Sequence, residues 1–181
     1  QVLVLTVQEN GLPGPQLTAN AGEAEIRGIE FEGQWALGEY VQILGTYAYL
    51  DTEYTKLDND LAINEGNALR NAPENAYSLS VVGDFPFANG HLNARADWTH
   101  KDVAYQDIAN LDAAKMPAYD VLNLRLAYAN ADRTWEVAGW VKNATDEEYL
   151  LHNSVLNPGL AQLQLPAPPM TVGVTATFAF G

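Results

Sequence analysis

The sequence predicts an all-β fold, an antiparallel transmembrane β-barrel in which about eight strands follow one another as a meander. Three observations predict it. Apolar and polar residues alternate with a period of two, long connections alternate with short ones, and aromatic residues gather near the predicted strand ends. These patterns are typical of strands that meet lipid on one face and a wet lumen on the other.

The composition excludes several other classes of protein. The 181 residues include no cysteine, which excludes disulfides and thiol-ligated metals, and the net charge of -14 argues against a nucleic-acid partner. The histidines share no ligand spacing and no catalytic motif is present, so we expect no cofactor, no metal site and no enzyme. No apolar run approaches the roughly 18 residues of a membrane-spanning helix, and the mean hydropathy of -0.16 is that of alternating strands.

The strands follow from the alternation, and their boundaries follow from clusters of Gly, Pro, Asn and Asp. We expect strands over residues 1–8, 24–37, 41–55, 76–87, 90–101, 118–129, 134–142 and 170–180. The Gly- and Pro-dense residues 9–20 predict an exposed loop, and residues 56–75, 102–117 and 143–169 predict long connections. Tight turns are expected at residues 38–39, 88–90 and 130–133.

The strand at residues 24–37 indicates what the polar face meets. Phe31 and Trp35 alternate with Glu30 and Glu32, and two glutamates would be unfavourable against a dry core but suit a wet lumen. The next strand has an ambiguous parity, because Leu44 and Leu50 interrupt its polar face.

The later strands alternate more sharply and give two sets of residues. The residues predicted to line the lumen are Glu30, Glu32, His91, Asn93, Arg95, Asp97, Asn123, Arg125, Glu136 and Lys142. Those predicted to face lipid are Leu92, Trp98, Leu122, Leu124, Leu126, Trp135, Val137, Val172, Val174 and Phe178.

The lengths of the connections predict an orientation. Outer-membrane barrels have short periplasmic turns and long extracellular loops, which places the long connections outside the cell and both chain ends on the periplasmic side. Aromatic residues are expected at both membrane boundaries. They are Trp35, Phe85, Tyr128, Trp135 and Phe178 at the turn end, and Tyr49, Tyr77 and Trp98 at the loop end.

Four phrases resemble one family. NAGEAEIRGIEFEGQW is similar to the "NA…a…GvElel" strand of TonB-dependent outer-membrane receptors, and GNALRNAPENAYSLS is similar to their "G…l.naP…..l" passage. YDVLNLRLAY followed by WEVAGWVKNATDEEYL resembles their near-terminal hairpin, and MTVGVTATFAF resembles their closing strand.

The resemblance implies that residues 1–181 are the C-terminal segment of a larger barrel of about 22 strands, without its plug domain. The family imports scarce ligands such as iron–siderophore complexes, and TonB supplies energy by acting on the plug. The implied partners are outer-membrane lipid, the remaining barrel and plug in the same or a separate chain, TonB through the plug, and an unidentified small-molecule ligand. Phe178 and Phe180 resemble the signal that the barrel-assembly machinery recognises, although the family usually ends on the aromatic residue and this chain ends on Gly181.

The long loops hold the remaining candidates. Tyr149, Leu151, His152 and Leu156 are predicted ligand contacts. Asp58, Asn59 and Asp60 offer oxygen ligands for calcium but lack the full EF-hand spacing, which favours a solvated loop.

Two alternatives stay open at this point. One is a complete eight-stranded outer-membrane barrel with a structural or adhesive role, which predicts pairing of residues 1–8 with residues 170–180. The other is a soluble β-sandwich that serves as a binding module, which predicts a buried apolar face.

Overall fold

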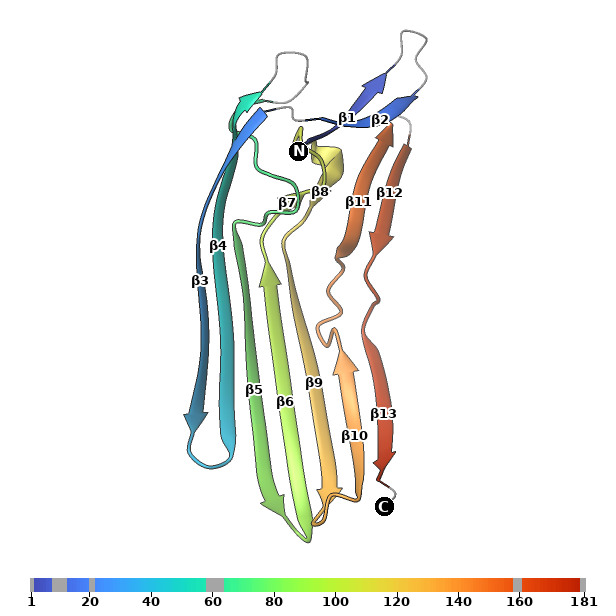
Figure 1. The fold of residues 1–181 in the computed structure, drawn as a ribbon. Helices are drawn as coiled ribbons and strands as arrows, with labels where there is room; N and C mark the ends of the chain where they lie inside the picture. Colours follow the sequence, from blue (N-terminus) through green and yellow to red (C-terminus); the bar gives the residue numbers. More distant parts are fainter. Residues whose placement is uncertain (1, 8–12, 20–21, 58–63, 158–160, 180–181) are drawn as a thin grey trace.

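The computed structural model describes residues 2–7, 13–19, 22–57, 64–157 and 161–179. Seven antiparallel strands form one tall curved sheet in the order β13-β10-β9-β6-β5-β4-β3 (Figure 1). They are β3 (Gly22–Leu37), β4 (Val41–Leu57), β5 (Asn75–Phe87), β6 (Gly90–Lys101), β9 (Tyr119–Asn130), β10 (Trp135–Lys142) and β13 (Thr171–Phe178). The all-β antiparallel fold predicted from the sequence is confirmed.

Tight turns join the strands at one end of the sheet and long connections join them at the other (Figure 1). Gly38 has a φ of +71° in the β3–β4 turn, a left-handed conformation that glycine adopts without steric cost. Ala88 and Arg133 adopt the same region, with φ of 51° and 53°, in the β5–β6 and β9–β10 turns. The predicted alternation of long and short connections is therefore present.

The pairing registers resolve which residues share a face. Trp35, Ile43, Val81, Ala96, Leu124, Val141 and Val172 form one continuous row across the seven strands. The row formed by Glu32, Thr46, Ser78 and Thr99 lies on the opposite face. Leu44, whose parity was ambiguous in the sequence, pairs with Gln34 and Ser80 and lies on the polar face.

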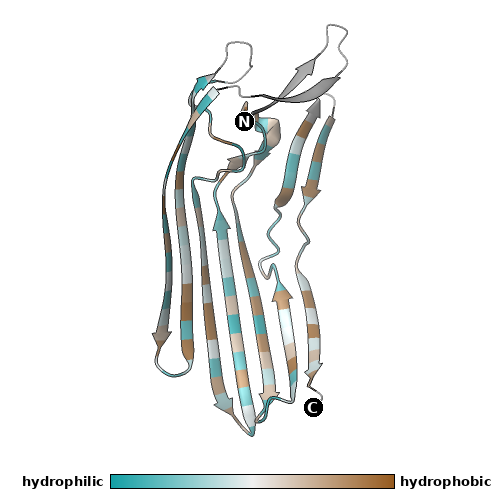
Figure 2. Ribbon diagram, viewed as in Figure 1, coloured by the Kyte–Doolittle hydropathy of each residue, from teal (hydrophilic) through white to brown (hydrophobic). Residues whose placement is uncertain are grey.

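The apolar face is uncovered. Val172, Val174 and Ile29 are 69%, 77% and 68% exposed, and Phe178 is 60% exposed. Figure 2 shows the alternating bands of hydrophilic and hydrophobic residues along the strands. Within the described ranges no second layer packs on this face, so the sandwich alternative is wrong.

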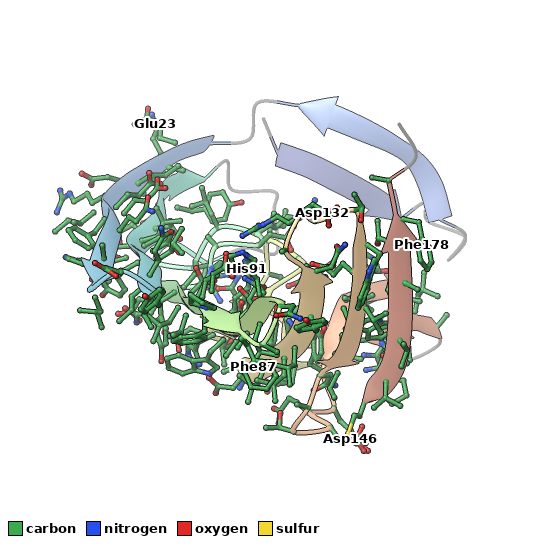
Figure 3. All side chains as sticks on the ribbon, turned by 90° about the horizontal axis from the view of Figure 1, so that it is seen from below. Glu23, Phe87, His91, Asp132, Asp146 and Phe178 are labelled. Carbon is green, nitrogen blue, oxygen red and sulfur yellow. The ribbon has the colours of Figure 1, made fainter. Side chains whose placement is uncertain are left out.

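The sheet curves around its polar face. In Figure 3, which looks along the strands, His91 lies on the concave side and Phe87 on the convex side. Among the described residues, no helix is long and apolar enough to cross a membrane.

Aromatic rings border the apolar face at both ends. Tyr77 stacks on His100 at 4.5 Å and meets Trp98 at 5.1 Å near the loop end, and Tyr128 lies 5.6 Å from Trp135 near the turns. Ten residue steps separate Tyr77 from Phe87 on β5. At about 3.4 Å per residue and a tilt of about 35–45°, the rows lie about 24–28 Å apart, close to the apolar band of an outer-membrane barrel, about 25 Å tall.

The first predicted strand is not part of the seven-stranded sheet, which corrects the prediction of about eight strands in one sheet. β1 (Val2–Val7) pairs with β2 (Pro13–Ala19) in a separate two-stranded sheet, and β2 occupies the predicted exposed loop. Prolines are tolerated in β2 because an edge strand need not donate from every residue. Figure 1 places β1 and β2 at the end of the long connections, whereas β13 ends beside the tight turns. The periplasmic location of both chain ends stays a prediction.

The long segment before the closing strand is a second correction. β11 (Leu150–Asn157) and β12 (Ala161–Pro166) form a hairpin where a loop was predicted. A backbone hydrogen bond from Ala167 N to Tyr149 O, 2.9 Å long, continues this pairing just beyond Leu150 and Pro166. Alternation of Leu163 and Leu165 with polar residues was the available signal.

The strands that pair with β1 and with β13 argue against a complete eight-stranded barrel. β13 pairs with β10, and β1 pairs with β2, so the predicted ladder between residues 1–8 and 170–180 is not formed among the described residues. The large sheet is therefore open, with β3 and β13 at its edges.

Candidate functional site

The concave polar face carries every residue that the sequence assigned to a lumen. These residues come from β3, β6, β9 and β10, and the registers align them in rows across the sheet. The residues assigned to lipid lie together on the opposite face. Which of the two faces meets lipid stays a prediction.

An ion pair spans the middle of the polar face. The Arg125 guanidinium donates from Nη2 to Glu136 Oε1 across the β9–β10 pair. Ala127 and Ala138 pair with each other between these two residues and are only 2% and 0% exposed. Because the two alanines are small, the long side chains can lie along the sheet surface and cover them.

A second ion pair lies beside the first. Arg95 Nε donates to Asp97 Oδ2 at 2.7 Å, and Ser80 Oγ donates to Asp97 Oδ1 at 2.5 Å. Arg95 on β6 and Arg125 on β9 are direct Cα partners on the same face. Two guanidinium groups therefore project side by side from the centre of the concave wall.

Trp140 extends this row onto β10, directly opposite Arg125. Its Nε1 donates to Thr175 Oγ1 at 3.1 Å, and the Lys142 ammonium lies 5.5 Å from its ring centroid. Trp140 was not named among the residues predicted to line the lumen, although the alternation places it on the same face as Glu136 and Lys142. Arg95, Asp97, Asn123, Arg125, Trp140 and Lys142 line one shallow hollow.

A third ionic group stands at the turn end of the same face. Arg133 Nη2 donates to Asp84 Oδ2 at 2.8 Å, and His91 Nδ1 lies 3.6 Å from Asp84 Oδ1. It ties the β9–β10 turn to β5.

At the other end of the sheet, side-chain amides tie the long connections together. Asn110 donates to Ala68 O at 3.0 Å and accepts from Ala68 N at 2.8 Å. Asn153 on β11, 2% exposed, donates to Ala113 O at 3.0 Å and to Lys115 O at 2.7 Å. Gln162 on β12 donates to Asn153 Oδ1 at 2.8 Å. The hairpin thus holds η1 (Asp112–Ala114) and β8 (Lys115–Met116), which pairs with β7 (Ala104–Tyr105).

The predicted ligand contacts occupy different settings. Tyr149 stacks on Tyr119 with ring centroids 4.4 Å apart. Burial raises the pKa of Tyr149, and the neighbouring Tyr119 adds a smaller effect in the same direction. Leu151 is 52% exposed and His152 is half-buried. The side chain of Leu156 lies outside the description. Asn110, Asn153 and Gln162 were missed because isolated amides in long loops carry no motif.

His100 forms a polar cluster near the loop end of the apolar face. Its Nδ1 lies 3.0 Å from Asp120 Oδ1 and its Nε2 lies 3.1 Å from Asp102 Oδ1. The two carboxylates approach opposite sides of the ring. In the part of the chain that is described, no group of three or more His, Asp or Glu residues is arranged to hold a metal ion, and the calcium candidate at Asp58, Asn59 and Asp60 falls outside it.

These features define a class of protein. A curved antiparallel sheet with tight turns at one end, long connections at the other, an uncovered apolar face and a polar concave face is the wall of an outer-membrane β-barrel. The chain belongs to the TonB-dependent receptors, because the family described as "TonB dependent receptor-like, beta-barrel" matches residues 1–144. The family resemblance seen in the sequence is confirmed.

Individual relatives agree with this family. The chain is 32% identical to the metal-pseudopaline receptor CntO of Pseudomonas aeruginosa over 148 residues, which cover 81% of the chain and 20% of that protein. It is 30% identical to the ferrichrome outer membrane transporter/phage receptor of Escherichia coli, with the same two coverages. The chain thus spans about a fifth of the length of these relatives.

A solved structure has the same fold. The ferric yersiniabactin uptake receptor FyuA from Yersinia pestis superposes with a TM-score of 0.77 at 22% identity, covering 90% of this chain and 24% of that one.

Proposed function

We propose that the chain forms part of the barrel wall and of the extracellular ligand vestibule of an outer-membrane receptor that takes up a scarce ligand, such as an iron–siderophore complex. The observation that carries the proposal is the two-faced curved sheet, whose apolar face is bare and whose polar face is concave. The names of two relatives, a metal-pseudopaline receptor and a ferrichrome outer membrane transporter/phage receptor, support the ligand class.

In this proposal the bare apolar face meets lipid and the polar face lines the lumen. The tight turns are periplasmic and the long connections are extracellular. The vestibule includes the β11–β12 hairpin, the region from β7 to β8 that it holds, and the Tyr119–Tyr149 stack. Further strands of the receptor pair with the free edges of β3 and β13, the plug fills the lumen, and TonB acts through the plug. The barrel-assembly machinery inserts the chain.

The four tryptophans allow a direct test of the two faces. Trp35, Trp98 and Trp135 share the apolar face, whereas Trp140 lies on the polar one. Each is assigned in the fluorotryptophan-labelled receptor, reconstituted in lipid nanodiscs, by its Trp→Phe variant in fluorine NMR. Spin-labelled lipid should broaden the first three signals, and a soluble gadolinium chelate should broaden that of Trp140. The reverse pattern would refute the assignment of the faces.

Uptake is tested in cells that lack the receptor carrying this chain. Radioactive iron is supplied as trihydroxamate or as tricarboxylate complexes, with and without an uncoupler of the proton gradient. At least one complex should enter only when the receptor is restored and the gradient is intact. Uptake of every complex at the rate of the deleted strain would contradict the importer proposal.

A further inference from the structure

We propose that the cationic patch, defined as Arg95, Arg125, Lys142 and Trp140, binds the carboxylate or phosphate group of a small molecule inside the lumen. The inference rests on the proposed function in one respect, which is that the concave face is the lumenal one. It adds a binding site on the barrel wall itself, at mid-height and away from the vestibule loops.

The pairing of two arginines is the first argument. Like charges at directly opposed positions of two strands destabilise a sheet, and Arg95 and Arg125 are such partners. Each has its own carboxylate, Asp97 for Arg95 and Glu136 for Arg125, so the arrangement can persist without ligand. Each acid lies to one side of its arginine. Asp97 is two residues along β6 from Arg95, and Glu136 lies diagonally across Ala127 and Ala138 from Arg125. In the strand register, neither Asp97 nor Glu136 lies between Arg95 and Arg125.

The local charge balance is the second argument. The chain carries a net charge of -14, yet three cations stand here against the two carboxylates Asp97 and Glu136. Lys142 makes no ion pair within the described residues; its ammonium lies over the Trp140 ring instead. The patch is therefore a cationic spot in an acidic protein, and charge complementarity favours an anion.

The available donors are the third argument. A guanidinium has five N–H donors in a planar fork that matches carboxylate and phosphate geometry. Arg95 uses Nε and Nη2 on Asp97, and Arg125 uses Nη2 on Glu136, so each fork retains donors. The two side chains are 48% and 35% exposed, so the described residues of this chain do not cover either guanidinium.

Trp140 gives the site its shape and favours a small molecule. The indole is fixed by its hydrogen bond to Thr175 and by close contact with Gly173, and it forms a flat apolar surface next to the guanidinium row. A ligand that combines an oxyanion with a ring or an apolar body can stack on this surface while the arginines bind its charge.

Fluorine NMR of the complete receptor tests the site with citrate and inorganic pyrophosphate as probes. The Trp140 signal should shift on titration and saturate. Arg95→Gln and Arg125→Gln should each weaken the apparent affinity about tenfold or more, because each removes a charge-assisted hydrogen bond to the anion. Lys142→Gln should weaken it by a smaller factor. Arg133→Gln is the matched control, since Arg133 pairs with Asp84 at the turn end and lies outside the patch.

The outcomes separate this inference from the proposed function. No shift of the Trp140 signal, or a shift that the arginine variants leave unchanged, would overturn the site. A shift seen only after deletion of the receptor's plug would assign the patch to an acidic segment of the plug and would also overturn it. Broadening of Trp140 by spin-labelled lipid would instead refute the lumenal assignment.

Discussion

The indole of Trp140 on β10 occupies the space above Gly173, its direct partner on β13. A Cβ atom at Gly173 would lie 2.2 Å from Trp140 Cζ2 and 2.6 Å from Cε2. Glycine is needed here for close approach of a rigid ring, and the hydrogen bond to Thr175 prevents the ring from moving freely. This pair fixes both the closing strand and the orientation of the only described tryptophan on the polar face.

We therefore expect Gly173→Ala to destabilise the receptor by about 1–3 kcal/mol, because overpacking must displace the indole from Thr175. Denaturant unfolding in detergent gives the free energy change. Gly139→Ala is the control, because a Cβ at Gly139 on β10 meets nothing within 4 Å. Equal losses for the two variants would show that the Trp140–Gly173 contact is unimportant.

Two neighbouring residues of β9 test the faces energetically. Leu124 is 40% exposed on the apolar face, so Leu124→Arg should destabilise the receptor by roughly 2–4 kcal/mol near the bilayer midplane. Asn123→Arg should cost far less, since Asn123 lies on the polar face next to the row of Arg125. Unfolding in lipid vesicles measures both, and similar losses would count against the assigned parity.

The wall was predictable because its signal is local and repeated. Alternation with a period of two assigned Leu92 to one face and Arg95 to the other, and turns near Gly38 and Gly90 set the register of their hairpins. Leu44 was harder, because an apolar side chain on a polar face breaks the pattern on which the prediction depends.

The loop end was less predictable for a different reason. Its structure depends on single amides that bridge segments far apart in sequence, such as Asn110 with Ala68 and Asn153 with Lys115. Such bonds leave no periodicity. The β1–β2 hairpin was missed because its prolines and glycines are typical of loops.

A larger side chain at Ala138 should disturb the ion pair above it. Ala138 is 0% exposed under the Arg125–Glu136 pair, so Ala138→Leu should cost about 1–3 kcal/mol by overpacking and should displace that pair. Ala176→Leu provides a contrast on the exposed apolar face of β13, where the larger side chain meets no cover. Denaturant unfolding compares them, and a neutral Ala138→Leu variant would contradict the packing described here.

Acid should weaken the loop end through Asp102, which follows β6. Asn75 Nδ2 donates a hydrogen bond to Asp102 Oδ2 at 2.7 Å, and His100 also hydrogen-bonds to Asp102. These bonds lower the pKa of Asp102 below 3.8. A lowered pKa stabilises the fold above the unfolded value, and this contribution is lost as the pH falls through the folded value. Asp102→Asn should therefore flatten the loss of stability below about pH 4. Thermal unfolding between about pH 2 and 6 measures this, and parallel profiles for Asp102→Asn and the parent would refute it.

The buried amide of Asn153 should control the order of the loop end. Its Nδ2 donates to Ala113 O and Lys115 O, and Gln162 also reaches Ala113 O, at 2.6 Å, so Asn153→Ala leaves the Lys115 carbonyl without this donor. We expect a local loss of about 1–3 kcal/mol, seen as faster hydrogen exchange over residues 112–116 with little change in the wall strands. Leu151→Ala, at a 52% exposed position of the same strand, should leave exchange unchanged. Because the hairpin and the region from β7 to β8 both belong to the proposed vestibule, Asn153→Ala should also weaken ligand binding to the receptor. Unchanged exchange in Asn153→Ala would show that other contacts hold the region in place.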